Sequence, residues 1–253
     1  MKAVATTDTG RVRATNQDNI YCSTSQVGPL PNLFAVADGM GGGKAGDYAS
    51  RSAIEELVRL IGSYSGKVHE GDAFFPSIVN YAVRNTNLKL YMESCEDDAL
   101  EGMGSTLVLC SVIGDTLWTC NVGDSRLYVL DKHSIRQITK DHSYVEELVA
   151  QGIIDKDSED YKRQKNLITR AMGIGRNVDA DIFSHTMLPG EKILMCSDGL
   201  SNMIEDSRIL GIVNRNPDIE AAMKELVFEA NLVGGSDNIS VILISGEESE
   251  EGL

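Results

Sequence analysis

Short apolar segments, some alternating with polar residues and some continuous, occur along most of the chain and predict β-strands. The expected strands are residues 2–7, 19–24, 32–38, 105–113, 116–122, 125–130, 134–138, 182–187, 193–197 and 238–245. Several links between them are short and polar, as at Gly114-Asp115, which is typical of tight turns. Strands joined in this way are expected to lie side by side and antiparallel.

Apolar residues recur at helical spacing in other segments. The expected helices are residues 44–61, 75–93, 144–151, 206–213 and 217–232, the last with Pro217 as a suitable first residue. Residues 153–166 are strongly polar and aperiodic, and are predicted to be a mobile loop or flap. Because helices come in pairs between runs of strands, the pattern predicts an α+β fold with antiparallel sheets and helix layers, and not an alternating βαβ array.

The 253 residues, 42% of them hydrophobic, allow one large domain with a substantial core, or two small ones. No linker and no repeat is visible, so we expect a single domain over residues 1–246 and a solvated acidic tail over residues 247–253. The formal net charge of −15 disfavours polyanionic partners, so neither nucleic acid nor a membrane surface is expected to bind.

Five cysteines, an odd number without a Cys-x-x-Cys pair, argue against a disulfide framework and a zinc site. Cys110 and Cys196 lie in apolar runs and are expected to be buried thiols in a reducing compartment. The N-terminus lacks the apolar core of a signal peptide, and no run approaches the roughly 18 apolar residues of a membrane span. A soluble, cytoplasmic, monomeric protein is expected.

Five aspartates share a setting, because each lies where a predicted strand meets a loop. They are Asp18, Asp38, Asp124, Asp198 and Asp237. Ordinary turn chemistry explains any one of them alone. If all five converge, carboxylates about 4 Å apart repel by roughly 4 kcal/mol per pair at an effective dielectric constant of about 20, and have to take up protons or cations. A set of oxygen ligands favours Mg²⁺ or Mn²⁺ over zinc or copper.

Two arginines, Arg11 and Arg13, stand close before Asp18 in this acidic chain. A planar guanidinium can hold two phosphate oxygens at once. We interpret Arg11 as an exposed loop residue and Arg13, through its proximity to the acids, as a phosphate ligand.

Two other motifs compete with a metal site. Gly41–Gly46 matches the G-x-G-x-x-G dinucleotide fingerprint between a strand and a helix, but that helix leads to another helix and not to a parallel strand. Cys120–Arg126 resembles the phosphate loop of cysteine-dependent phosphatases, in which the thiolate attacks phosphorus. Cys120 lies inside a predicted strand and not at its exit, and Asp124 would put negative charge in the loop, so Cys120 is expected to be a core thiol and not a nucleophile. His142 could be a general acid, but a lone loop histidine is more often structural or exposed.

Seven segments, taken in chain order, resemble the metal-dependent serine/threonine protein phosphatases of the PPM or type 2C family, and most closely its compact bacterial form. They are Gly10–Asp18, Ala37–Gly42, Gly104–Thr106, Val122–Arg126, Asp141–Ser143, Cys196–Leu200 and Ser236–Ser240. The resemblance covers nearly the whole chain. It implies a single phosphatase catalytic domain built as a four-layer α-β-β-α sandwich, with two central antiparallel sheets flanked by helix pairs and a flap over residues 143–167.

The resemblance also implies a site with two Mn²⁺ or Mg²⁺ ions. In it, Asp38 would bridge the ions, Asp18 and the Gly39 carbonyl would bind one of them, and Asp198 and Asp237 would bind the other. Arg13 would bind the substrate phosphate. In bacterial relatives Asp124, with Asp198, would support a weaker third ion.

The implied mechanism is direct attack on phosphoserine or phosphothreonine by a metal-bridging hydroxide, without a phosphoenzyme. Many eukaryotic members carry a histidine, proposed as the general acid, where this chain has Met40, so metal-bound water would protonate the leaving group instead. Phosphorylated proteins would be the substrates, and a bacterial Ser/Thr kinase the opposing partner. The alternatives are a nucleotide-binding oxidoreductase that uses Gly41–Gly46 and an inactive phosphatase-like binding module.

Overall fold

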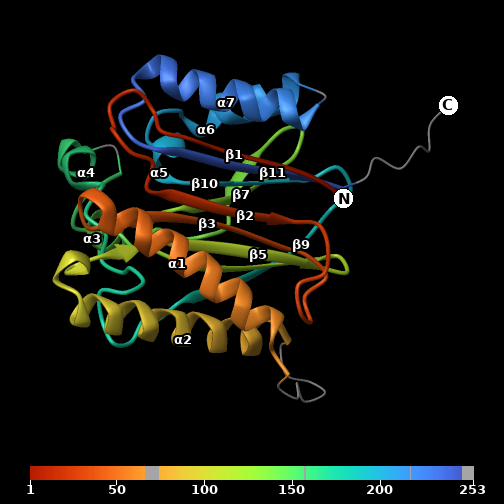
Figure 1. Ribbon diagram of the computed structural model, residues 1–253. Helices are drawn as coiled ribbons and strands as arrows, with labels where there is room; N and C mark the ends of the chain where they lie inside the picture. Colours follow the sequence, from red (N-terminus) through yellow and green to blue (C-terminus); the bar gives the residue numbers. More distant parts are fainter. Residues whose placement is uncertain (66–73, 157, 217, 247–253) are drawn as a thin grey trace.

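The computed structural model describes residues 1–65, 74–156, 158–216 and 218–246, and these form four layers, with helices on both outer faces of two stacked sheets (Figure 1). The predicted acidic tail, 247–253, and the predicted helix start at Pro217 lie outside the described residues. The predicted α+β sandwich is confirmed, because every pairing between named strands is antiparallel in the part of the chain described.

Two sheets form the centre of the molecule. The five-stranded sheet has the order β1 (Lys2–Asp8), β11 (Ile239–Ser245), β10 (Lys192–Cys196), β7 (Arg126–Leu130) and β8 (Ile135–Gln137). The six-stranded sheet has the order β2 (Asp18–Ser23), β3 (Leu33–Met40), β5 (Leu107–Ile113), β6 (Thr116–Val122) and β9 (Asp181–Thr186), with the short β4 (Gly104–Ser105) also paired to β3.

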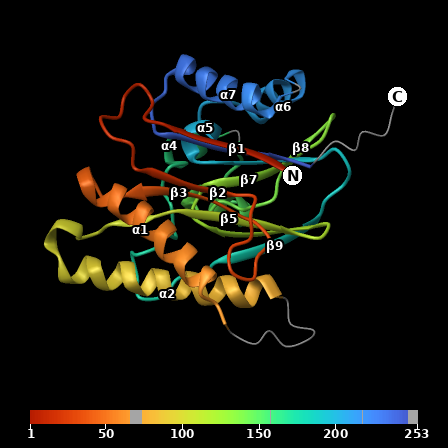
Figure 2. The ribbon, with the colours of Figure 1, turned by 45° about the vertical axis from the view of Figure 1, so that its right-hand side comes forward.

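Helices cover each sheet on its outer face. The six-stranded sheet is covered by α1 (Gly43–Gly62) and α2 (Phe74–Glu96), and the five-stranded sheet by α5 (Asp198–Ser201), α6 (Asp206–Arg215) and α7 (Ile219–Val233). The remaining helical segments are η1 (Asp98–Leu100), α3 (Tyr144–Ala150) and α4 (Glu159–Gln164). The view in Figure 2 shows the same separation of the two helix layers. No helix within the described ranges has the length and apolar character needed to cross a membrane.

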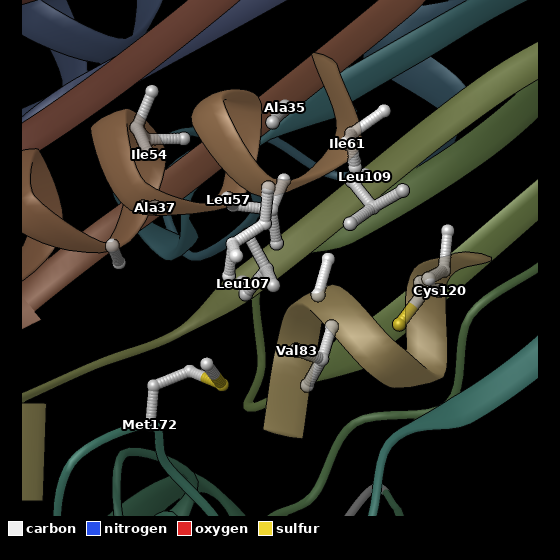
Figure 3. Packing of buried hydrophobic residues seen from close by; sticks show 14 of the residues in the cluster. Ala35, Ala37, Ile54, Leu57, Ile61, Val83, Leu107, Leu109, Cys120 and Met172 are labelled. Atoms are coloured by element: carbon white, nitrogen blue, oxygen red, sulfur yellow. The ribbon is translucent and has the colours of Figure 1, made fainter. Parts of the chain in front are cut away.

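The core has three layers of side chains, and the alternation along β3 explains why its sequence is continuously apolar. Leu33, Ala35 and Ala37 face α1 and α2, in the layer drawn in Figure 3. Phe34 and Val36 point the other way, into the layer between the two sheets. A strand buried on both faces needs apolar residues at successive positions, and this is the pattern in the sequence.

The predicted mobile loop over residues 153–166 is wrong in part, because it contains α4. The Ser158 hydroxyl caps this helix by accepting a hydrogen bond from the Tyr161 backbone N–H at 3.2 Å. Its six residues are too few to show a helical apolar period, so the capping residue was the only local signal of a helix. The four-residue α5 was not predicted either, for the same reason.

Candidate metal centre

Strand alternation brings two of the acids to the layer between the sheets. Asp38 continues the series Phe34 and Val36 on β3, so its side chain lies at the end of the inter-sheet core. Asp18 on β2 is paired directly with Asp38 in the sheet register. Side chains paired in this way have Cβ atoms about 5 Å apart, where like charges destabilise the pair.

Asp18 is held from the opposite sheet. Its Oδ2 accepts hydrogen bonds from the hydroxyls of Ser197 and Ser240, each at 2.7 Å. The other oxygen, Oδ1, is buried and has no hydrogen-bond partner among the described residues. One oxygen of this carboxylate is therefore fixed, and the other is left for a ligand.

Asp198 is positioned by the close packing of two chain segments. Asp198 begins α5 directly after β10, and its Oδ2 accepts from Asn202 Nδ2 at 2.8 Å. A Cβ at Gly199 would lie 1.9 Å from the Asn238 carbonyl oxygen, so only glycine lets α5 approach the segment that carries Asp237. The Asp198 Oδ1 atom is buried and, like Asp18 Oδ1, has no partner in the described structure.

Gly39, which follows Asp38 near the end of β3, also allows a close approach of two backbones. Its N–H donates to the Gln17 carbonyl at 3.1 Å, and a Cβ at this position would lie 2.0 Å from the Gly46 carbonyl oxygen. Any larger residue would push α1 away from the end of β3. The glycine thus keeps the backbone beside Asp38 and Asp18 compact.

The pKa values show that the five acids form one electrostatic group. Burial raises the pKa of Asp38 well above its ordinary value, and the charges of Asp18, Asp198, Asp124 and Asp237 raise it further. Burial and neighbouring carboxylates also raise the pKa of Asp198 to about 8. Burial is the largest cause of the shifts at Asp18 and Asp124, whose pKa values are each raised to about 6. The structure thus brings together the five aspartates that the sequence singled out.

This cluster fits hard divalent cations in an open arrangement. Within the described ranges, no three His, Cys, Asp or Glu side chains form a ready-made metal cage. Magnesium-like ions commonly take only one or two carboxylates each and keep several waters, so a closed cage is not required. Two buried, unpartnered carboxylate oxygens and mutually raised pKa values are what such ions would relieve. The individual ligand roles of Asp18, Asp38, Gly39, Asp124, Asp198 and Asp237 stay predictions.

The two arginines before Asp18 differ in position. The Nη2 of Arg13 donates to Asp237 Oδ2 at 2.7 Å, while half of the Arg13 side chain stays exposed. Asp237 therefore holds the guanidinium at the rim of the cluster, where it can also meet an incoming anion. Arg11 is exposed and is fixed only through its backbone N–H, which donates to Gly235.

The competing motifs do not form the sites that they suggest. β3 pairs antiparallel with both of its long neighbours and α1 leads into α2, so Gly41–Gly46 is not part of a βαβ unit. Gly41 and Gly42 instead have positive φ angles of 125° and 71°, which turn the chain from β3 into α1. Burial raises the pKa of Cys120 to about 12, which keeps the thiol protonated and unreactive.

Two cavities lie elsewhere. One of about 650 Å³ lies between α2 and the segment before β9, and another of about 360 Å³ lies beside β7 and β9. Neither is lined by any of the five aspartates or by Gly41–Gly46. Neither of these two cavities is therefore part of the aspartate cluster.

Several polar residues that support the cluster were not singled out from the sequence. They are Thr106, Ser125, Ser197, Asn202, Asn238 and Ser240. Thr106 and Ser125 join the two sheets through hydroxyls 2.7 Å apart, and the same Thr106 hydroxyl accepts from the Asp38 N–H at 2.9 Å. The alternation of side chains along the strands was a usable signal for two of them. Thr106 lies two residues before Val108 and Ser240 two residues before Ile242, so both hydroxyls fall on the inter-sheet face.

Comparisons with known proteins agree along almost the whole chain. A family model described as protein phosphatase 2C matches residues 9–228. The serine/threonine phosphatase stp of Listeria monocytogenes is 34% identical over 254 residues, which cover 100% of this chain and 98% of that protein. The crystal structure of serine/threonine phosphatase Stp1 from Staphylococcus aureus is similar with a TM-score of 0.85 at 32% identity, over 97% of this chain and 95% of that one. The catalytic domain of serine threonine protein phosphatase PstP in complex with two manganese ions has a TM-score of 0.79 at 34% identity and covers 96% of each chain.

The raised pKa of Asp198 predicts how stability depends on pH when divalent ions are removed. An unfolded aspartate titrates near 3.9, whereas Asp198 in the fold titrates at about 8, so the folded protein binds more protons between these values. Its contribution to stability is complete below the unfolded pKa and is lost as the pH rises through the folded one. In chelator, the unfolding temperature of Asp198→Asn should therefore exceed that of the wild type by a margin that grows from pH 6 to pH 9.

Differential scanning calorimetry at several pH values measures this margin. The comparison with the variant cancels the contributions of the titrating groups outside the aspartate cluster. A margin that stays constant or shrinks with rising pH would contradict the prediction. Saturating Mn²⁺ should reverse its sign, because the ions bind the carboxylate form in the wild type.

Proposed function

Since this chain belongs to the protein phosphatase 2C family and is a protein serine/threonine phosphatase, we propose that it removes phosphate from serine and threonine in proteins by a metal-dependent reaction at the five-aspartate cluster. One observation carries the proposal: the charges of Asp18, Asp124, Asp198 and Asp237 all raise the pKa of Asp38 at one rim, and two buried oxygens of the cluster lack partners among the described residues. A relative of 34% identity has been solved with two manganese ions, which supports Mn²⁺ or Mg²⁺ as the ions.

In this proposal Asp38 would hold both ions, because it is the carboxylate whose pKa the other four charges all raise. Asp18 and the Gly39 carbonyl would hold one ion, and Asp198 and Asp237 the other. Asp124, whose charge raises the pKa of both Asp38 and Asp198, would support a weaker third ion. Bound ions of this kind turn water into a nucleophile near neutral pH and fix phosphate oxygens for in-line attack.

Two side chains that could act as nucleophiles, Ser197 and Cys120, are not available for attack in the described structure. The Ser197 hydroxyl donates to Asp18 and accepts from the Ser240 N–H at 3.0 Å, so its proton and its lone pair are both engaged. Cys120 is protonated and buried. Attack by water, without a phosphoenzyme, is consistent with these two contacts.

Arg13 binds the phosphate in this scheme. Its one side-chain hydrogen bond in the described structure, to Asp237, uses one of the five guanidinium N–H groups. The half-exposed remainder can hold two phosphate oxygens beside the acids. The pairing with Asp237 aims the guanidinium, so the arginine needs little reordering when the substrate arrives.

The leaving group takes its proton from water in this proposal, because Met40 cannot donate one. Burial lowers the pKa of His142, and both of its ring nitrogens already face partners, Gly123 and Asp181. His133 lies in the turn between β7 and β8, and His185 is bonded to Glu191. None of these three described histidines is placed to protonate a serine oxygen.

The substrates are proteins phosphorylated on serine or threonine, and the natural opponent is a kinase of the same specificity. We also propose that residues 1–246 form one catalytic domain, which acts as a monomer in the cytoplasm. An oxidoreductase at Gly41–Gly46 has no supporting geometry, and an inactive binding module would not need all five carboxylates.

Asp38→Asn tests the metal-dependent mechanism. The amide keeps the shape of the side chain but removes the charge between the ions. Removing a partner of a metal ligand already lowers activity about 10- to 100-fold, so loss of the bridging ligand should lower kcat by at least about 100-fold. Phosphate release from a phosphothreonine peptide, with Mn²⁺ and with excess chelator, measures it.

Asp115→Asn, in the exposed turn between β5 and β6, is the matched control and should keep wild-type turnover. Chelator should abolish turnover in the wild type. Full turnover in chelator, or an active Asp38→Asn variant, would refute the mechanism.

Arg13→Ala tests the phosphate ligand. A hydrogen bond to a charged group is worth about 1.5–3 kcal/mol, so kcat/KM for a phosphopeptide should fall roughly 10- to 150-fold at saturating Mn²⁺. Arg13→Lys should be intermediate, because it keeps the charge and loses the two-pronged geometry. Arg11→Ala, two residues away and exposed, is the control. Equal effects at the two positions would assign the arginines a general electrostatic role only.

A further inference from the structure

His142 is buried at the base of the flap, residues 143–167, and no catalytic step uses it. Its side chain is only 4% exposed. Both ring nitrogens of this buried side chain have partners, Gly123 and Asp181, so the ring is held in one orientation.

The ring and backbone of His142 together clamp Gly123, because they bond the peptide groups on both sides of its Cα. The Gly123 N–H donates to His142 Nδ1 at 3.1 Å, and the His142 N–H donates back to the Gly123 carbonyl at 2.9 Å. Gly123 directly precedes Asp124. Two reciprocal hydrogen bonds therefore fix the backbone from which the Asp124 side chain leaves.

The ring is itself oriented from its other side. Because Nδ1 accepts a hydrogen bond, the proton of the neutral ring is on Nε2, which faces Asp181 Oδ2 at 3.2 Å. Arg170 donates to the second Asp181 oxygen, Oδ1, at 3.0 Å. Asp181 thus accepts from both His142 Nε2 and Arg170. It favours the ring tautomer of His142 whose Nδ1 can accept from Gly123.

The backbone of His142 also closes the flap. Its carbonyl accepts from the Thr169 N–H at 2.7 Å, Ser143 pairs with Ile168, and the Tyr144 N–H donates to Leu167 at 2.8 Å. The two ends of the flap are therefore joined at the residue whose ring holds the Gly123 peptide. The base of the flap and the backbone before Asp124 are therefore joined through His142.

We propose that His142 is a positioning residue for Asp124: its Nδ1 acceptor holds the Gly123 peptide so that the Asp124 carboxylate is aimed at a third, weakly held divalent ion. The inference rests on the proposed function, because the aim of Asp124 matters only if ions occupy the cluster. The tighter pair of ions, around Asp38, should not depend on His142.

Two substitutions separate the roles of the two ring nitrogens of His142. In His142→Asn the amide oxygen can take the place of Nδ1 and accept from Gly123, while the contact with Asp181 is lost. In His142→Gln the longer amide can reach Asp181, while the acceptor at the Nδ1 position is lost. His133→Gln, in the turn between β7 and β8, is the matched control.

The measurements are the Mn²⁺ concentration that gives half-maximal phosphopeptide turnover and, without substrate, the number of tightly bound Mn²⁺ ions counted by electron paramagnetic resonance. For His142→Gln the half-maximal concentration should rise about 10- to 100-fold, as for loss of other residues that orient a metal ligand, while two tight ions remain. His142→Asn should recover most of this loss.

Asp181→Asn gives a second route if substitutions at the buried ring prevent folding, since Asp181 is partly exposed. It removes the charge that selects the ring form, so the half-maximal Mn²⁺ concentration should rise in the same direction.

The proposal is overturned if His142→Gln needs no more Mn²⁺ than the wild type, or if the Asn and Gln variants are impaired equally and also lose tight ions. It is likewise overturned if Asp181→Asn folds and leaves the half-maximal Mn²⁺ concentration unchanged. A wild type that turns over without Mn²⁺ would instead refute the proposed function itself, and so the two failures are distinguishable.

Discussion

Repulsion among five carboxylates, two of them buried and three partly buried, at one end of the inter-sheet core is the constraint on which the site depends. Burial and like charge both raise the pKa of Asp38 and Asp198, so the acids oppose folding in their ionised form. Neutral side chains of the same shape would fold more readily. In the proposed mechanism, divalent cations would offset this cost by binding the folded state, and the same ions would supply the reactive water.

The surrounding structure follows from the need to hold these acids close together. Glycines at 39 and 199 let backbones meet where a Cβ would collide with a carbonyl oxygen. Hydroxyls from Ser197 and Ser240 fix one oxygen of Asp18 across the gap between the sheets. Arg13 supplies the one positive charge bonded to the cluster in the described structure, at the rim where a phosphate would enter. Asp124 is connected through Gly123 and His142 to the flap.

Much of this could be predicted from the sequence, because two-sided burial leaves a clear pattern. The continuous apolar run of β3 ends on Asp38, whose side chain lies on the same face as Phe34 and Val36, between the sheets. In β2, Asp18 likewise shares the inter-sheet face with Ile20. The family resemblance supplied the convergence, which local pattern alone does not contain. What could not be predicted depends on tertiary contacts: the hydroxyls of Ser197 and Ser240 look like ordinary strand serines, and α4 is too short for its period to be seen. His142 was expected to be structural or exposed, and only the structure shows that its ring accepts a hydrogen bond from the backbone N–H of Gly123, the residue before Asp124.

Anomalous diffraction from crystals grown with Mn²⁺ tests the central claim most directly, because it locates each ion without reference to activity. The account predicts two strong peaks that share Asp38, one also contacting Asp18 and the other also contacting Asp198 or Asp237, with a weaker third peak beside Asp124. Peaks bound elsewhere, with no ion touching Asp38, would contradict it.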